Sequence, residues 1–290
     1  MRLRSRSRHD PLAPSSLFMN ETTSSFGIQT CDQGEVTIDL APYTYQQLQK
    51  QSVSLTAFIQ KLSAFITALE HNQEQYNINP YTEKFNRGIH ILGKHGSELD
   101  VFPAASLALK CSEGRWGAEN PRKQFFRSIQ LACEFETRLN EREKALLQIC
   151  PVYLHFQTRA RSALFQQSLF MQKIEGTPLG KTEAGFSAEF CQLFKIPTCN
   201  EILQKFRFSL HRFLDPDQQR QLLKIQSTYL FQRLAERGIT IFSLNQKNIL
   251  ATLNTSRQQV QYVIIDPIPD YYLPLSPAYN LLTGYFCKAI

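Results

Sequence analysis

The order of periodic segments along the chain predicts an α+β fold with two lobes. Short strand-like segments with turns occupy residues 89–111, and a helical stretch follows at about residues 124–150. Two further strand-like segments, 152–157 and 163–173, precede a mostly helical half that closes with a strand-like segment at 260–265. Strands, a helix, more strands and then helices indicate a sheet-containing lobe followed by a helical lobe.

Length and composition are those of an ordinary soluble globular protein. The 290 residues are 42% hydrophobic and 20% charged, and no apolar run approaches the roughly 18–20 residues that cross a bilayer. Arg2, Arg4, Arg6 and Arg8 supply four of the seven net positive charges, and no apolar segment of a signal peptide follows them. We therefore expect a disordered tail over residues 1–35, no nucleic-acid partner and no membrane span.

Residues 36–85 predict a strand and an amphipathic helix in front of the two lobes. Residues 35–40 alternate in polarity, and Ser54 is a suitable N-cap for a helix. The following apolar residues recur at helical spacing: Leu55, Phe58, Ile59, Leu62, Phe65, Ile66 and Leu69. We expect this apolar stripe to dock on the adjacent lobe; a secretion chaperone or a membrane surface are the alternatives, and the polar side is poor in the Lys and Arg that membranes attract.

The seven cysteines include no C-x-x-C pair, and most of them stand among apolar residues. Structural zinc sites need close pairs of Cys or His ligands, so no zinc site is expected. Reduced and mostly buried thiols in a cytosol-like compartment are the prediction.

The most informative segment is the loop that contains Asn248, together with the strand that ends at Asp266. Asn248 follows a helix that ends near Gly238, and the apolar strand 262–265 leads directly into Asp266. Both side chains offer the hard oxygen ligands that Mg²⁺ prefers. This layout resembles the catalytic loop H-R-D-x-x-x-x-N and the metal-binding aspartate of a protein kinase. The position of the catalytic aspartate, five residues before Asn248, holds Ser243.

Two earlier segments fit the same resemblance. Gly93 and Gly96 lie in a turn that resembles a shortened G-x-G-x-x-G loop, whose backbone would cover the phosphates of ATP. Leu107-Ala108-Leu109-Lys110 matches V-A-I-K, which implies that Lys110 meets the phosphates. A surface lysine at a strand end and an ordinary hairpin turn are the alternatives.

The lysine of a kinase pairs with a glutamate on the next helix, where the chain offers Glu134 and Glu136. We expect Glu134 to take this role; if Ser128 occupies the position instead, the ion pair is lost. The segment from Met171 through Lys173 to Gly176 resembles the hinge that holds adenine by its backbone, which implies Met171 and Lys173 in cofactor binding.

The combination resembles the bacterial type III secreted effector kinases of the NleH and OspG type. Residues 171–176 resemble that family's hinge, residues 231–239 resemble its helix before the catalytic loop, and 290 − 266 = 24 residues follow the metal aspartate, as in a truncated C-lobe. The resemblance covers about residues 89–290 and implies a two-lobed kinase-like fold, with lobes at 86–170 and 171–290. It also implies ATP and Mg²⁺ as cofactors, secretion into the host cytoplasm, virulence through interference with signalling proteins, and docking of ubiquitin-conjugating enzymes.

Ser243 decides which function is expected, because a serine does not take a proton at neutral pH and family members keep aspartate there. General-base assistance contributes roughly 10²–10⁴-fold to rate, so its loss favours a pseudokinase or a weak atypical kinase. An active Ser/Thr kinase, another ATP-dependent transferase and a nucleotide-independent interaction module are the alternatives. Without the family resemblance, a cytoplasmic location would be expected.

Overall fold

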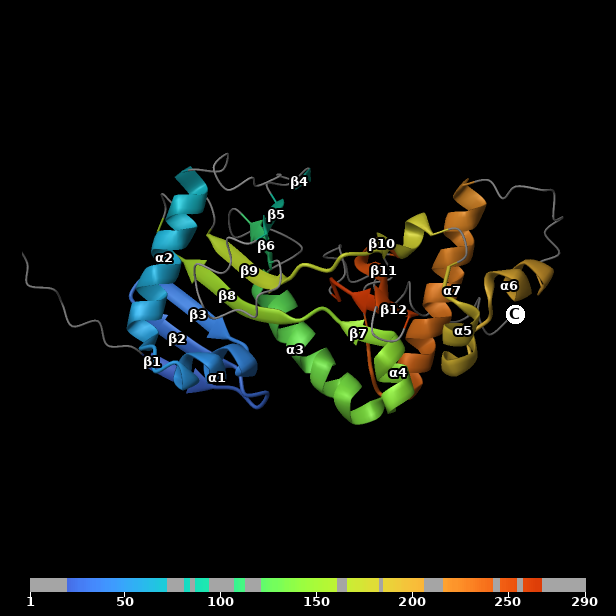
Figure 1. Ribbon diagram of the computed structural model, residues 1–290, viewed down its shortest axis with the longest axis horizontal. Coiled ribbons are helices and arrows are strands. Elements are labelled where there is room, and N and C mark those ends of the chain that lie inside the picture. Colours follow the sequence, from blue (N-terminus) through green and yellow to red (C-terminus); the bar gives the residue numbers. More distant parts are fainter. Residues whose placement is uncertain are drawn as a thin grey trace, which may run out of the picture.

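The computed structural model describes residues 20–71, 81–83, 87–93, 107–112, 121–160, 166–182, 185–205, 216–241, 246–254 and 258–267. Its elements form two groups, as Figure 1 shows. Strands β1–β3 and helices α1 and α2 lie at one end, α5–α7 lie at the other, and α3 runs between them. The α+β class predicted from the sequence is confirmed.

The larger sheet has eight described strands, and every neighbouring pair is antiparallel. In spatial order they are β1 (Asn20–Thr23), β2 (Gln29–Gln33), β3 (Val36–Leu40), β8 (Val152–Thr158), β9 (Gln167–Gln172), β6 (Leu107–Ser112), β5 (Arg87–Gly93) and β4 (Tyr81–Glu83). Because β3 pairs with β8, the N-terminal region belongs to the same sheet as the strands of the first lobe.

Helix α2 (Leu55–His71) covers one face of this sheet, and α1 (Pro42–Lys50) precedes it. The apolar stripe that the sequence indicated contributes Phe58, Ile59, Leu62, Phe65 and Ile66 to a core that also contains residues of β3, β6, β8 and β9. The docking of this helix on the adjacent lobe is therefore confirmed. The hydroxyl of Ser54 accepts a hydrogen bond from the amide of Ala57 at 3.2 Å, as expected of an N-cap.

Helix α3 (Pro121–Arg138) covers the opposite face. Successive side chains of β6 point to opposite faces of the sheet. Leu107 and Leu109 belong to the core under α2, whereas Ala108 packs with Phe125 and Ile129 of α3. Lys110 is in phase with Ala108, so the strand directs this lysine toward α3. Proline at the first position of α3 is favourable because its missing N–H would have no partner there.

The second group is built on a four-stranded sheet in the order β10 (Thr177–Pro178), β11 (Ile249–Asn254), β12 (Gln259–Ile264) and β7 (Leu147–Ile149). The elements packed around it are η2 (Leu179–Lys181), α5 (Ala188–Phe194), α6 (Cys199–Lys205), α7 (Pro216–Glu236) and η3 (Gln246–Asn248). Stacked rings of Phe186, Phe190 and Phe194, with Tyr262 against their edges, fill the centre of this group.

Two expectations differ from the structure. Residues 20–33, assigned to a disordered tail, form β1 and β2, because alternate buried residues such as Cys31 pack under α2 even though the segment is mostly polar. The predicted helix 124–150 begins at Pro121 and divides into α3, α4 (Glu141–Leu146) and β7. Asn140 starts α4 through a capping box with Glu143, which a continuous helix could not accommodate.

The remaining expectations concern two segments outside the described residues, membrane-spanning helices and the cysteines. The predicted strand 98–102 and the C-terminal residues after Pro267 lie outside the described part of the chain. None of the described helices is long and apolar enough to cross a membrane. Of the described cysteines, Cys31, Cys150 and Cys191 are buried, whereas Cys133 is exposed.

Candidate functional site

The two sheets meet at an ion pair between Lys110 and Asp266. The Lys110 Nζ lies 2.8 Å from the Asp266 Oδ2, and only 8% and 10% of the two side chains are exposed. The residues are 156 positions apart in the sequence. A buried ammonium or carboxylate costs several kcal/mol unless it is paired, so each charge stabilises the other in this position. The structure thus brings together two of the predicted site residues.

Gln124, in the first turn of α3, connects both members of this pair. Its Oε1 accepts a hydrogen bond from the Lys110 Nζ at 2.8 Å, and its Nε2 donates to the carbonyl of Ile265 at 3.0 Å. The side chain is almost fully buried. Because the amide uses both its acceptor and its donor, it fixes the lysine relative to the backbone just before Asp266.

Asn248 lies beside the same segment. Its carbonyl accepts a hydrogen bond from the amide of Ile265 at 2.8 Å, and the next residue, Ile249, pairs with Ile264 in the β11–β12 ladder. Asn248 and Asp266 therefore stand at adjacent ends of two paired strands. This hairpin explains why two residues 18 positions apart in the sequence lie close together.

The segment after β9 connects the two sheets, as expected of a hinge. Met171 is buried and pairs with Ala108 of β6, and Lys173 forms an ion pair with Glu175. A Cβ added at Gly176 would lie 2.7 Å from the carbonyl oxygen of Ala251, so this close approach of backbone requires glycine. Directly after it, β10 joins β11 in the second sheet.

Cys150 lies beside the hinge but is not a candidate nucleophile. Its Sγ donates to the carbonyl of Gln172 at 3.3 Å. Burial raises the pKa of this thiol to about 12, against a smaller opposing effect of that hydrogen bond. At neutral pH the thiol stays protonated, and its role is packing against the hinge backbone.

The expected pairing of Lys110 with Glu134 is not what the structure shows. The Glu134 carboxylate accepts hydrogen bonds from Gln130 at 2.8 Å and from Arg127 at 3.3 Å, all on α3. Glu134 is ten residues beyond Gln124, or about 15 Å along the helix, which explains why it does not reach the lysine. Gln124 takes the position instead, and Ser128, buried one turn later, is not the partner either.

Gln124 was not predicted from the sequence, because the expected partner of Lys110 on this helix was a glutamate. A signal was available: Gln124 precedes Ser128 by four residues and therefore lies on the same helix face. Proline at position 121 marks the start of the helix, which places residue 124 in the first turn, close to the end of β6.

The predicted phosphate-covering turn is described only at its start. Gly93 ends β5 and pairs with Leu107 across an irregularity in the β5–β6 ladder. Gly96 and Ser243 lie outside the described residues. In the described part of the chain, no three His, Cys, Asp or Glu side chains gather as a ready-made metal site. Asp266 and Asn248 offer one carboxylate and one amide oxygen, which are oxygen ligands of the kind that Mg²⁺ prefers.

Neither a scan of protein-family models nor a search of curated proteins finds a match for this chain. Its function therefore has to be inferred from the residues gathered at the junction of the two sheets.

Proposed function

We propose that this chain is a protein-kinase-like protein with two lobes that binds ATP and Mg²⁺ and acts mainly as a pseudokinase. The observation that carries the proposal is the contact of Lys110 with Asp266 at the junction of the two sheets. A lysine on an inner strand and a carboxylate after a hairpin strand are the two charged groups that such a site requires.

The order of elements supports this assignment. Strands β4–β6 are followed by α3, then β8 and β9, then the hinge and the helices α5–α7. The hinge passes from one sheet to the other directly beside Met171 and Cys150, and it offers backbone donors and acceptors to a planar base. Asn248 and Asp266 follow in the order in which a kinase presents its two metal ligands.

In this proposal each residue has one task. Lys110 neutralises phosphate charge, Asn248 and Asp266 hold the cation, and the backbone of residues 171–176 receives the adenine. The cation supplies neutralisation of the charge on the phosphates. Ligand binding requires Lys110 to exchange its contact with Asp266 for a phosphate oxygen, and Gln124 retains the lysine in place during that exchange.

Ser243 is the reason for preferring a pseudokinase over an active enzyme. Kinases turn over at about 1–100 s⁻¹, and losing the general base lowers the rate roughly 10²–10⁴-fold. A weak atypical kinase or another ATP-dependent transferase is therefore the second form of the proposal. Secretion into a host cell and docking of host signalling proteins, ubiquitin-conjugating enzymes among them, rest on the resemblance to the effector kinases alone.

A nucleotide-independent interaction module is the second candidate function. The observation that favours it is the Lys110–Asp266 pair itself, because the two charges already satisfy each other without a ligand. Gln124 also favours this candidate, because the helix residue that contacts Lys110 is a neutral amide and not the glutamate expected of a kinase.

Thermal unfolding with and without millimolar Mg-ATP separates the two candidates. A site that binds ATP gains about 2.7 kcal/mol at a ligand concentration of 100 Kd, which raises the unfolding temperature by a few degrees. Lys110→Met should abolish the shift, whereas Lys205→Met, which changes an exposed lysine at the end of α6, should retain it. An unchanged unfolding temperature of the wild type would leave the interaction module as the function.

Phosphotransfer is tested with ATP labelled at the γ-phosphate. The pseudokinase proposal expects no incorporation above the level of Asp266→Ala, and Ser243→Asp should create or increase incorporation. Incorporation by the wild type that disappears in Asp266→Ala would identify an active transferase instead.

A further inference from the structure

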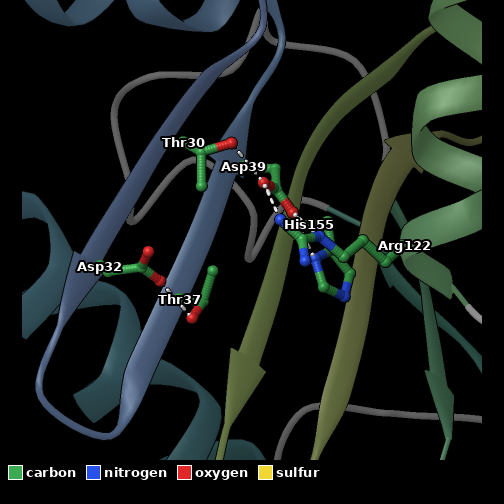
Figure 2. A network of polar contacts seen from close by, with 6 residues as sticks. All are labelled: Thr30, Asp32, Thr37, Asp39, Arg122 and His155. Carbon is green, nitrogen blue, oxygen red and sulfur yellow. Dashed lines mark hydrogen bonds and ion pairs between the residues drawn. The ribbon is translucent and has the colours of Figure 1, made fainter. Parts of the chain in front are cut away.

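A second charged network lies on the same face of the large sheet as Lys110. Asp39 of β3 is fully buried, and its carboxylate accepts four hydrogen bonds (Figure 2). Thr30 Oγ1 donates at 2.7 Å and His155 Nδ1 at 3.0 Å, while Arg122 donates from Nε at 2.8 Å and from Nη2 at 3.0 Å. Arg122 belongs to the first turn of α3, two residues before Gln124.

The charge states in this network follow from its surroundings. Burial disfavours the carboxylate, but the hydrogen bonds from His155, Arg122 and Thr30 outweigh it and lower the pKa of Asp39. Burial also lowers the pKa of His155, against the opposing attraction of Asp39. A neutral His155 donates through Nδ1, and its Nε2 has no hydrogen-bond partner in the described structure. Asp39 and Arg122 are therefore the charged members.

The registers of the strands place both networks in one row. Thr30 pairs with Asp39, Asp39 with His155, His155 with Leu169, and Leu169 with Lys110. Directly paired residues point to the same face of a sheet, so this whole row faces α3. Asp39 and Lys110 are three strand spacings apart, or about 14 Å.

The first turn of α3 contacts both ends of this row. Arg122 and Gln124 are two residues apart, so their side chains leave the helix about 200° apart. Arg122 reaches the Asp39 end with a bidentate contact, and Gln124 reaches the Lys110 end. Arg122 also lies 5.6 Å above the ring of Phe126, one turn along the same helix, which restricts its side chain further.

We propose that Asp39 and Arg122 are positioning residues for the nucleotide site: the N-terminal strand β3 holds the first turn of α3, and Gln124 in that turn holds Lys110. This inference rests on the proposed function for its ligand, ATP. In this proposal residues 20–71 support the site, because Asp39 of β3 accepts the two hydrogen bonds by which Arg122 fixes the start of α3 on the sheet. Neither residue touches the ligand in this proposal.

Arg122→Gln is the main test, because 40% of the Arg122 side chain is exposed and the variant is expected to fold. It should raise the Kd for Mg-ATP about 10- to 100-fold, as loss of a supporting contact typically does. Arg122→Lys keeps the charge but not the bidentate geometry, and should restore part of the affinity. Asp32→Asn is the matched control: it removes the charge of a carboxylate that accepts a 2.6 Å hydrogen bond from Thr37 between β2 and β3, without touching α3, and should bind like the wild type.

A double-mutant cycle distinguishes positioning from general loosening of the fold. In a Gln124→Ala background, Arg122→Gln should change the Kd by about twofold or less, because the route from Arg122 to Lys110 is already broken. A full 10- to 100-fold effect in that background would overturn the proposal.

Labelling of Lys110 tests the inference without nucleotide. With limiting acetic anhydride and mass-spectrometric detection, Arg122→Gln should increase the acetylation rate of Lys110 roughly tenfold, since local opening exposes a buried amine. Asp32→Asn should leave the rate unchanged. A wild-type rate in Arg122→Gln would refute the positioning role, whereas a wild type that binds no Mg-ATP refutes only the proposed function.

Discussion

The first turn of α3 contacts two ion pairs of different chemistry, Asp39 with Arg122 and Asp266 with Lys110. Asp39 meets a planar guanidinium through two hydrogen bonds and is completed by Thr30 and His155. Asp266 contacts the Lys110 ammonium, a compact point charge, at 2.8 Å. Arginine is pre-organised for a fixed bidentate contact, whereas lysine can rotate its three donors to another acceptor.

This difference separates a structural contact from an exchangeable one. The Asp39 network joins β2, β3, β8 and α3, which all belong to the first sheet and its cover. The Lys110–Asp266 pair joins the two sheets and has the chemistry to release each partner to a phosphate and a cation.

The largest effect is expected for Asp39→Ala. This change leaves the donors of Thr30 and His155 without their acceptor and removes the bidentate contact of Arg122, whose side chain is 40% exposed, so it should cost about 2–4 kcal/mol. Urea denaturation should show the loss in the free energy of unfolding. Asp32→Ala on the neighbouring strand, where the aspartate is exposed, serves as the control and should change stability little.

A smaller loss is expected at the other pair. Asp266→Asn keeps the shape but removes the charge, and should cost about 1–3 kcal/mol because the Lys110 ammonium then faces a neutral amide in place of the carboxylate. Adding Lys110→Met should recover part of this loss, since the buried ammonium is then removed as well. A double variant less stable than Asp266→Asn alone would show that the lysine is anchored by more than the aspartate. Neither variant should respond to Mg-ATP.

The sequence was informative where a motif combined residue type with spacing. Lys110 and Asp266, which the structure brings into contact, were predicted together because an apolar strand preceded each of them. The interval between Asn248 and Asp266 had the length of a hairpin of two short strands, and these strands are β11 and β12. The α2 stripe was found for a similar reason: seven apolar residues at helical spacing leave one plausible buried face.

The roles of Gln124 and Asp39 could not be predicted from the sequence, for physical reasons. A glutamine in a helix has no periodicity of its own, and its role depends on the end of a strand fourteen residues earlier. Asp39 looked like the polar residue of an alternating strand, which is normally solvated. Its burial arises because β8 and α3, distant in sequence, supply His155 and Arg122.

The pH dependence of stability should reveal the Asp39 network. His155 has a folded pKa below its ordinary 6.5, so the unfolded chain binds a proton first, and stability decreases as the pH falls below about 6.5. Asp39 has a folded pKa below its ordinary 3.8 and adds a further loss below that value. Each group changes stability by at most about 1.4 kcal/mol per pH unit.

Urea midpoints measured between pH 7.5 and 5 should therefore decline, and His155→Gln should flatten this decline while lowering stability at pH 7.5. A slope that is the same in the wild type and in His155→Gln would place the titrating group elsewhere. The Lys110–Asp266 pair provides the contrast, since Asp266→Asn should leave the slope in this window intact.

The smallest effect is expected for Glu134→Gln, which removes the charge of the residue first expected to pair with Lys110. Glu134 instead accepts from Arg127, whose guanidinium also donates to the carbonyl of Thr240 in the segment after α7. An amide can still accept from Arg127, so the free energy of unfolding should change by about 1 kcal/mol or less. The Kd for Mg-ATP should stay within about twofold of the wild type. A loss of affinity as large as that of Gln124→Ala would mean that Glu134 supports the lysine after all, and that the first turn of α3 does not act alone.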